Sequence, residues 1–209
     1  SSTLGAASPQ ANLGKDVTLS EALTFAEQNL DGLLGDDPAV LMTIRSTLSN
    51  IFSNRGEIDK ALKYARAIEA QLETGVEGLA NSWSSVYQNL VYIFLSASEF
   101  DRALRYSSQL DKLLRSAEQP DWTRIAENIN SQAIGLTSMG RLDEALEKLG
   151  EVQRIHNEEE PLPAQFMAGM HNNMASALYS RSDLEGAEVH ISQAVGFMTK
   201  AGLGDTLNG

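Results

Sequence analysis

Residues 56–68 read GEIDKALKYARAI, and the chain writes the same pattern three more times. The copies are residues 98–110 (SEFDRALRYSSQL), 140–152 (GRLDEALEKLGEV) and 182–194 (SDLEGAEVHISQA). All four share an alanine at the sixth position, and consecutive alanines are 42 residues apart: Ala61, Ala103, Ala145 and Ala187. A fixed period in this range indicates a repeat array, in which each unit buries its apolar face against its neighbours.

The aligned columns predict that a helix begins in every copy. The first position holds only glycine or serine, which are residue types that cap helix N-termini. Three residues further on stands a carboxylate, which would meet unpaired N–H groups and the positive end of the helix dipole. The shared alanine is small enough for two helices to cross closely, so we expect the four alanines to lie at packed helix contacts. The first-position residues are Gly56, Ser98, Gly140 and Ser182.

A second helix is predicted just upstream of each copy. Apolar residues recur there at a spacing of three or four, which is typical of an amphipathic helix. The pairs are Leu48 and Phe52, Leu90 and Phe94, Ala133 and Leu136, and Met174 and Leu178. Each unit is therefore a helix, a tight turn and another helix.

This unit resembles the tetratricopeptide repeat (TPR), although the usual TPR has 34 residues. The longer repeat is similar to that of kinesin light chains, including the bacterial kinesin-light-chain-like proteins. The family's Asn-Asn-Leu-Ala string is matched best by Asn172-Asn173-Met174-Ala175 and partly by Gln88-Asn89-Leu90-Val91. The resemblance implies an all-α fold, a right-handed α-solenoid of four helix-turn-helix repeats preceded by an N-terminal capping helix.

The expected domain organisation is one elongated array. Residues 1–16 are expected to be disordered, 17–201 to form the solenoid and 202–209 to fray. The cap helix is expected at 18–34, and the repeats at about 38–74, 77–116, 120–156 and 161–200. The start at Ser1 predicts a processed product or a fragment. Because no capping helix is predicted after the fourth repeat, we expect the native protein to continue, to oligomerise through this end or to tolerate an open end.

Composition excludes several classes of function. The net charge is −12, and an acidic surface repels phosphate backbones, so nucleic acid is not expected as a partner. The charge does not imply membrane contact, which stays possible through a local amphipathic patch, and the longest apolar run, residues 90–95, is too short to span a bilayer. Disulfide and thiolate chemistry are excluded because the chain has no cysteine. A cytoplasmic location is expected.

The search for catalytic chemistry finds no motif. The three histidines do not form a metal-ligand string, and the nearest carboxylate run, residues 158–160, is interpreted as solvated surface. His190 shares a column with Tyr64, Tyr106 and Lys148, so we interpret it as a repeat position that faces a neighbour. No catalytic residue, cofactor or metal is predicted, and the chain is not expected to be an enzyme.

By resemblance, the functional surface is the concave groove that TPR arrays build from their first helices. Amide side chains there could pair with the backbone of an extended peptide, and tyrosines could add anchors. Asn89 and Asn173 have an alternative role, in which they bond to the adjacent repeat. The groove positions contain no cation, which argues against a clamp for a C-terminal carboxylate. They are Ser46, Asn50, Gln88, Tyr92, Asn130, Ile134, Asn172, Ser176 and Tyr179, with Ser53, Leu95 and Thr137 also one turn beyond.

Two functions follow from these features. The first is a non-enzymatic scaffold that binds a partner protein or extended peptide in the groove, and the bacterial branch of the resemblance implies a tubulin-like filament as that partner, in a cytoskeleton-associated adaptor. The alternative is a regulatory TPR segment of a larger signalling protein, such as a kinase or a transcription regulator.

Overall fold

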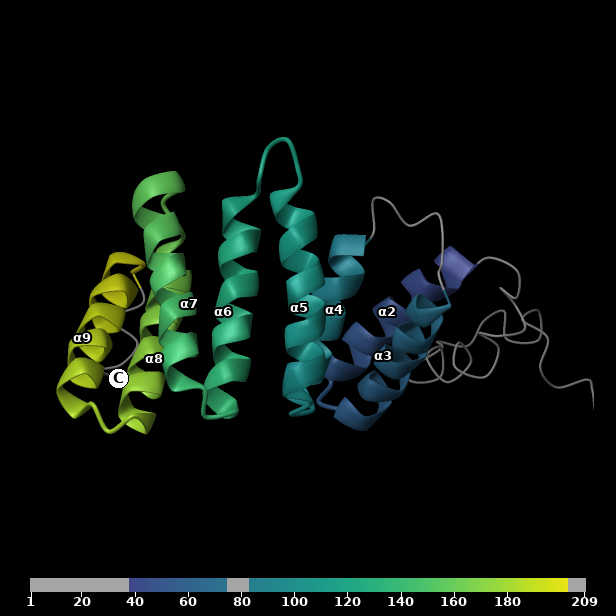
Figure 1. The fold of residues 1–209 in the computed structure, drawn as a ribbon, viewed down its shortest axis with the longest axis horizontal. Helices are drawn as coiled ribbons and strands as arrows, with labels where there is room; N and C mark the ends of the chain where they lie inside the picture. Colours follow the sequence, from purple (N-terminus) through teal and green to yellow (C-terminus); the bar gives the residue numbers. More distant parts are fainter. Residues whose placement is uncertain (1–37, 75–82, 203–209) are drawn as a thin grey trace, which may run out of the picture.

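The computed structural model describes residues 38–74 and 83–202, and within these ranges the chain folds into four consecutive helix pairs without a strand (Figure 1). The expected cap helix (18–34), the segment 1–16 and residues 203–209 lie outside the described residues. The helices of each pair pack on one another, and each pair packs on the next, as expected for an α-solenoid. The pairs are α2 (Pro38–Asn54) with α3 (Ile58–Glu73), α4 (Trp83–Ser96) with α5 (Phe100–Arg115), α6 (Trp122–Ser138) with α7 (Leu142–Arg154), and α8 (Ala164–Ser180) with α9 (Leu184–Lys200). The predicted all-α fold of four helix-turn-helix repeats is confirmed.

The shared alanines lie in the core of the array. Each is at most 4% exposed, and Ala61 and Ala145 are fully buried. The apolar residues upstream in the first helices pack against the same core, where for example the rings of Phe52 and Tyr64 stack at 5.9 Å. The two helices of each repeat therefore pack against each other at the shared alanine.

The turn between the helices of each repeat differs from the sequence prediction. Gly56, at the first position of the repeated pattern, has a φ of 75° and its N–H donates to the carbonyl of Ser53, while the N–H of Glu57 donates to that of Phe52. This pair of bonds is the Schellman motif, which ends a helix on a left-handed residue. The same bonds and positive φ recur at Ser98, Gly140 and Ser182.

The first-position column therefore terminates the first helix, and the prediction that it caps the second helix was wrong. The N-cap is the following residue in every repeat: Glu57, Glu99, Arg141 and Asp183. The physical reason is the tightness of the turn, because the chain must reverse direction through a left-handed residue, which glycine adopts without steric cost.

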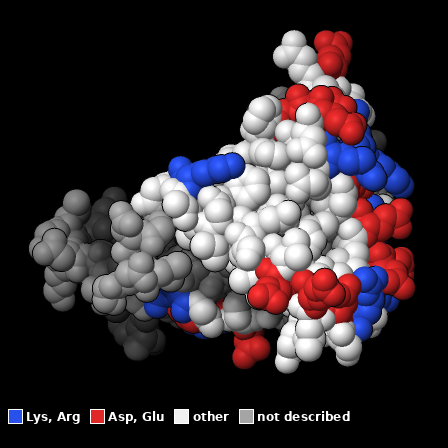
Figure 2. Space-filling model, turned by 90° about the vertical axis from the view of Figure 1, so that its left-hand side faces the viewer, with Lys and Arg blue, Asp and Glu red and all other residues white. Residues whose placement is uncertain are grey.

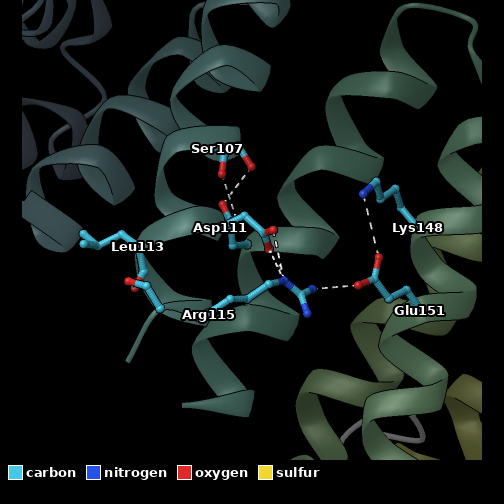
Figure 3. A network of polar contacts seen from close by, with 8 residues as sticks. Ser107, Asp111, Leu113, Arg115, Lys148 and Glu151 are labelled. Carbon is cyan, nitrogen blue, oxygen red and sulfur yellow. Dashed lines mark hydrogen bonds and ion pairs between the residues drawn. The ribbon is translucent and has the colours of Figure 1, made fainter. Parts of the chain in front are cut away.

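Polar contacts also connect the repeats. Arg115 on α5 lies between Asp111 of the same helix, at 3.0 Å, and Glu151 of α7, at 2.7 Å (Figure 3). Close by, the buried Ser107 hydroxyl donates to the side-chain carbonyl of Asn128 on α6 at 2.8 Å, and the Asn128 amide donates back to the Ser107 backbone carbonyl at 3.0 Å. The second and third repeats are thus held together by a buried hydrogen-bonded pair and a partly exposed ion-pair network.

Candidate functional site

The first helices α2, α4, α6 and α8 lie next to one another in that order, so their matching columns form a continuous surface. Between α2 and α4 this surface is hollowed into an open cavity of about 850 Å³. Four of the predicted groove residues, Ser46, Asn50, Gln88 and Tyr92, line it. The remaining lining residues are Thr43, Thr47, Ile51, Asn54, Ser85, Val86 and Asn89. We call this cavity the α2–α4 groove, and none of the described residues that line it is charged.

The α2–α4 groove offers hydrogen-bonding groups beside an aromatic ring. Asn50 and Gln88 are exposed, so their amides can both donate and accept. Tyr92 is 51% exposed, which leaves much of its ring available for contact. A smaller cavity of about 100 Å³ continues past Gln88 and Tyr92 to Glu127 and Ser131. The site can therefore hold an extended, uncharged backbone and contact one apolar or aromatic side chain.

A cation that the predicted columns omit reaches the edge of this groove. Arg124 on α6 donates from its guanidinium to the Gln88 side-chain carbonyl at 3.1 Å. It was missed because it lies in the first turn of α6, about 1.7 turns before the predicted position Asn130. Gln88 thus binds Arg124 in the free protein, and a ligand would share or replace that bond.

The other predicted groove residues lie outside both cavities. Ile134, Asn172, Ser176 and Tyr179 are exposed on α6 and α8. Asn130 is half-buried, and its side-chain carbonyl accepts from Asn173 at 2.9 Å. Among the residues one turn beyond, Ser53 is only 7% exposed, so it is part of the packed interior and not of the groove surface.

Two amides join adjacent first helices. The Asn173 amide bonds to Asn130, and the Asn89 amide donates to the Ser46 backbone carbonyl at 3.2 Å. This is the alternative role considered for Asn89 and Asn173. Because Asn130 takes part in such a link, replacing it would disturb the packing of repeats three and four as well as any ligand contact.

The sequence analysis also missed a cluster of histidines in the last two repeats. The Nδ1 atoms of His171 on α8 and His190 on α9 are 3.0 Å apart, and the His171 ring stacks on Phe197 at 5.4 Å. His156, in the π-helical turn η2 (Ile155–Glu159), meets the edge of the same Phe197 ring at 5.9 Å. Burial, together with His190 and His156, lowers the pKa of His171 to about 4.

A column comparison would have found this pair. In the second repeat the equivalent positions hold Tyr87 and Tyr106, whose rings stack at 6.0 Å. The histidine pair therefore occupies an aromatic packing position, and the lowered pKa of His171 keeps that ring neutral, which suits a structural role. Within the described ranges no group of three or more histidine, aspartate or glutamate side chains could hold a metal ion.

Comparisons with known proteins show a similarity in fold. No protein-family model and no curated protein sequence matches the chain. Among solved structures, BtubC (BKLC) from P. vanneervenii aligns with a TM-score of 0.67 at 19% identity, over 88% of this chain and 73% of that chain. A Podosopora anserina putative kinesin light chain with nearly identical TPR-like repeats gives a TM-score of 0.68 at 14% identity, over 87% of this chain and 88% of that chain.

A third similar structure is a Rap protein complexed with competence and sporulation factor. It aligns with a TM-score of 0.63 at 19% identity, over 87% of this chain and 48% of that chain. None of the described helices is both long enough and apolar enough to cross a membrane. The chain thus has the fold of TPR-like repeat proteins, similar to that of the putative kinesin light chain and of BtubC (BKLC).

Proposed function

We propose that the chain is a non-enzymatic scaffold that binds an extended segment of a partner protein in the α2–α4 groove. The observation that carries this proposal is the uncharged cavity of about 850 Å³ in which Ser46, Asn50, Gln88 and Tyr92 converge. A peptide in extended conformation exposes backbone N–H and C=O groups, and amide side chains can pair with both. The similar Rap structure is one that was determined in a complex, which supports binding as the function of this fold.

The residues that line the groove limit which partner segments can bind. Because the described residues that line the α2–α4 groove carry no charge, a strongly charged peptide would lose its hydration with a counter-charge only at the edge, where Arg124 already bonds to Gln88. The groove therefore favours a neutral segment with an apolar or aromatic side chain that packs on Tyr92. The predicted tubulin-like filament is the first source of such a segment to test, as the resemblance to kinesin-light-chain-like proteins suggests.

The test uses Tyr92→Ala with a matched control, Tyr179→Ala, which removes another exposed tyrosine from a first helix outside the cavity. Peptides are selected by phage display on the wild-type chain, and their affinities are measured by fluorescence anisotropy. We expect Tyr92→Ala to weaken binding by about tenfold or more, as for an aromatic anchor, and Tyr179→Ala to leave it unchanged. Equal affinity of both variants, or failure to select any peptide, would refute the proposal. Co-sedimentation with a tubulin-like filament then asks separately whether the filament is the source.

A further inference from the structure

The last helix, α9, exposes an aliphatic face at the end of the described array. Leu184, Ile191 and Val195 are 64%, 52% and 52% exposed. With Glu188 they are spaced by four, three and four residues, which places all four on one side of the helix. The end of the molecule that carries α9 is largely uncharged at its centre and charged at its margin (Figure 2). We call these four residues the α9 face.

Inside the array the equivalent face is covered by another helix. Ile191 is in register with Ala65, Ser107 and Leu149, and each of these is at most 1% exposed. Ser107 shows the cause, because it bonds at 2.8 Å to Asn128 on α6, the first helix of the next repeat. The α9 face therefore has the geometry of a surface on which another helix packs.

The α9 face is not a simple copy of the inner faces. Val195 stands where the earlier repeats have Glu69, Asp111 and Gln153, so the fold itself does not require an aliphatic residue there. An exposed apolar patch on a protein indicates a contact site.

Glu188 is a charged residue at a position that is apolar in the earlier repeats. It stands where the earlier repeats have Leu62, Leu104 and Leu146. Leu104 lies in the contact with the next repeat, since a Cβ added to Gly135 on α6 would meet it at 3.7 Å. A helix covering Glu188 must therefore supply a cation where an ordinary repeat would supply an apolar side chain.

Charge and size select the occupant. Two copies of this chain paired symmetrically through the α9 face would bring their Glu188 carboxylates together, and each chain has a net charge of −12. A face on one side of a single 17-residue helix also suits one docked helix better than a stable dimer, which needs about 800 Å² per partner.

The direction of the occupant follows from the preceding repeat. Arg181, at the end of α8, pairs at 3.0 Å with Asp143 in the first turn of α7. Glu185 is the residue of α9 in register with Asp143. A cation at the C-terminal end of an antiparallel helix would meet Glu185 in the same way, and would also complement the dipole of that helix.

We propose that the α9 face docks a basic amphipathic helix of a partner protein, antiparallel to α9. Aliphatic side chains of the partner pack on Leu184, Ile191 and Val195, and its Lys or Arg side chains pair with Glu188 and Glu185. This surface is separate from the α2–α4 groove.

The test uses two synthetic amphipathic peptides of about 18 residues that match the spacing of the α9 face and differ only in a central Lys or Glu. Anisotropy measures their binding to the full chain. We expect the Lys peptide to bind about tenfold more tightly, since attraction is exchanged for repulsion, and Glu188→Lys to reverse this preference. Ile191→Asp should abolish binding, and Tyr92→Ala should not affect it, which separates this site from the groove.

Several outcomes would overturn the proposal. One is equal binding of both peptides to the wild-type chain, or an unchanged preference in Glu188→Lys. Another is a dimer in analytical ultracentrifugation that Ile191→Asp dissociates, which would assign the α9 face to a second copy. A third is peptide binding only after deletion of residues 203–209, which would assign the face to the chain's own tail. Circular dichroism checks that each variant is folded, and Val195→Asp replaces Ile191→Asp if that variant is not.

Discussion

Acidification should weaken the contact between α8 and α9, because His171 is buried there in its neutral form. His171 is 3% exposed, its Nδ1 lies 3.0 Å from that of His190, and its pKa is lowered to about 4 by burial first and by His190 and His156 after it. Protonation of His171 would place a cation in this buried position, so the neutral form of His171 is linked to the folded state.

The sign and size follow from proton linkage. A histidine in the unfolded chain has its ordinary pKa of about 6.5, and the folded value is about 4. The unfolded state therefore binds more protons between these values, so the stabilisation is complete above pH 6.5 and is lost as the pH falls toward 4. At about 1.4 kcal/mol per pKa unit, the loss between pH 7.5 and pH 4.5 is about 2–3 kcal/mol.

The assay is urea denaturation followed by circular dichroism at a series of pH values in this range. His171→Phe keeps an aromatic ring beside Phe197 and cannot titrate, and its carboxylates respond to acid as those of the wild-type chain do. The difference between the two pH profiles thus isolates His171, and it should reach about 2–3 kcal/mol at pH 4.5.

Hydrogen exchange shows where the acid-induced loss of stability occurs, because α8 and α9 should lose protection before the earlier repeats. His190→Gln is the second control. It removes one cause of the lowered pKa but not burial, so it should reduce the acid effect only in part. Parallel pH profiles for the wild-type chain and His171→Phe would refute the reasoning.

Two further predictions concern the repeat columns. Ser98→Gly and Ser182→Gly should each raise the free energy of unfolding, measured by urea titration, by about 0.5–1 kcal/mol. Glycine relieves the left-handed strain of about 1–2 kcal/mol, and this gain exceeds the cost of the added backbone entropy in the unfolded chain, which is up to about 1 kcal/mol. A loss of stability would contradict this prediction. Ala103→Leu should cost about 1–3 kcal/mol by overpacking, and hydrogen exchange should rise first in repeats two and three. Uniform exchange across the described repeats would argue against that local coupling.

The fold was predictable because a solenoid buries its surface between sequence neighbours. The period of 42 residues therefore maps directly onto packing, and Ala61, Ala103, Ala145 and Ala187 are the buried residues that this period marks. The turn was misassigned because glycine and serine serve both as N-caps and at tight turns. Only the backbone separates these roles, and serine at a φ of 59° or 67°, as at Ser98 and Ser182, is uncommon enough that residue type favoured the wrong role.

The candidate site was harder to predict because one column can serve two purposes. Gln88 lines an open cavity, whereas Asn130, in the same column one repeat later, accepts a hydrogen bond from the next repeat. What differs is the bonding partner, because Asn173 bonds to Asn130 whereas Arg124 bonds to Gln88, and a sequence period does not encode these partners. A groove inferred from register alone therefore contains both ligand-facing and repeat-joining residues.

The histidine pair could have been predicted by comparing both helices of one repeat with those of another repeat. His171 and His190 lie 19 residues apart, so no short motif relates them, but they are about equally far from the turn at Arg181 and so meet across the α8–α9 hairpin. Tyr87 and Tyr106 meet in the same way in the second repeat. Reading both helices of a repeat against the equivalent pair in another repeat predicts such a contact. It does not predict the lowered pKa, which also depends on His156, a residue of the π-helical turn that precedes the fourth repeat.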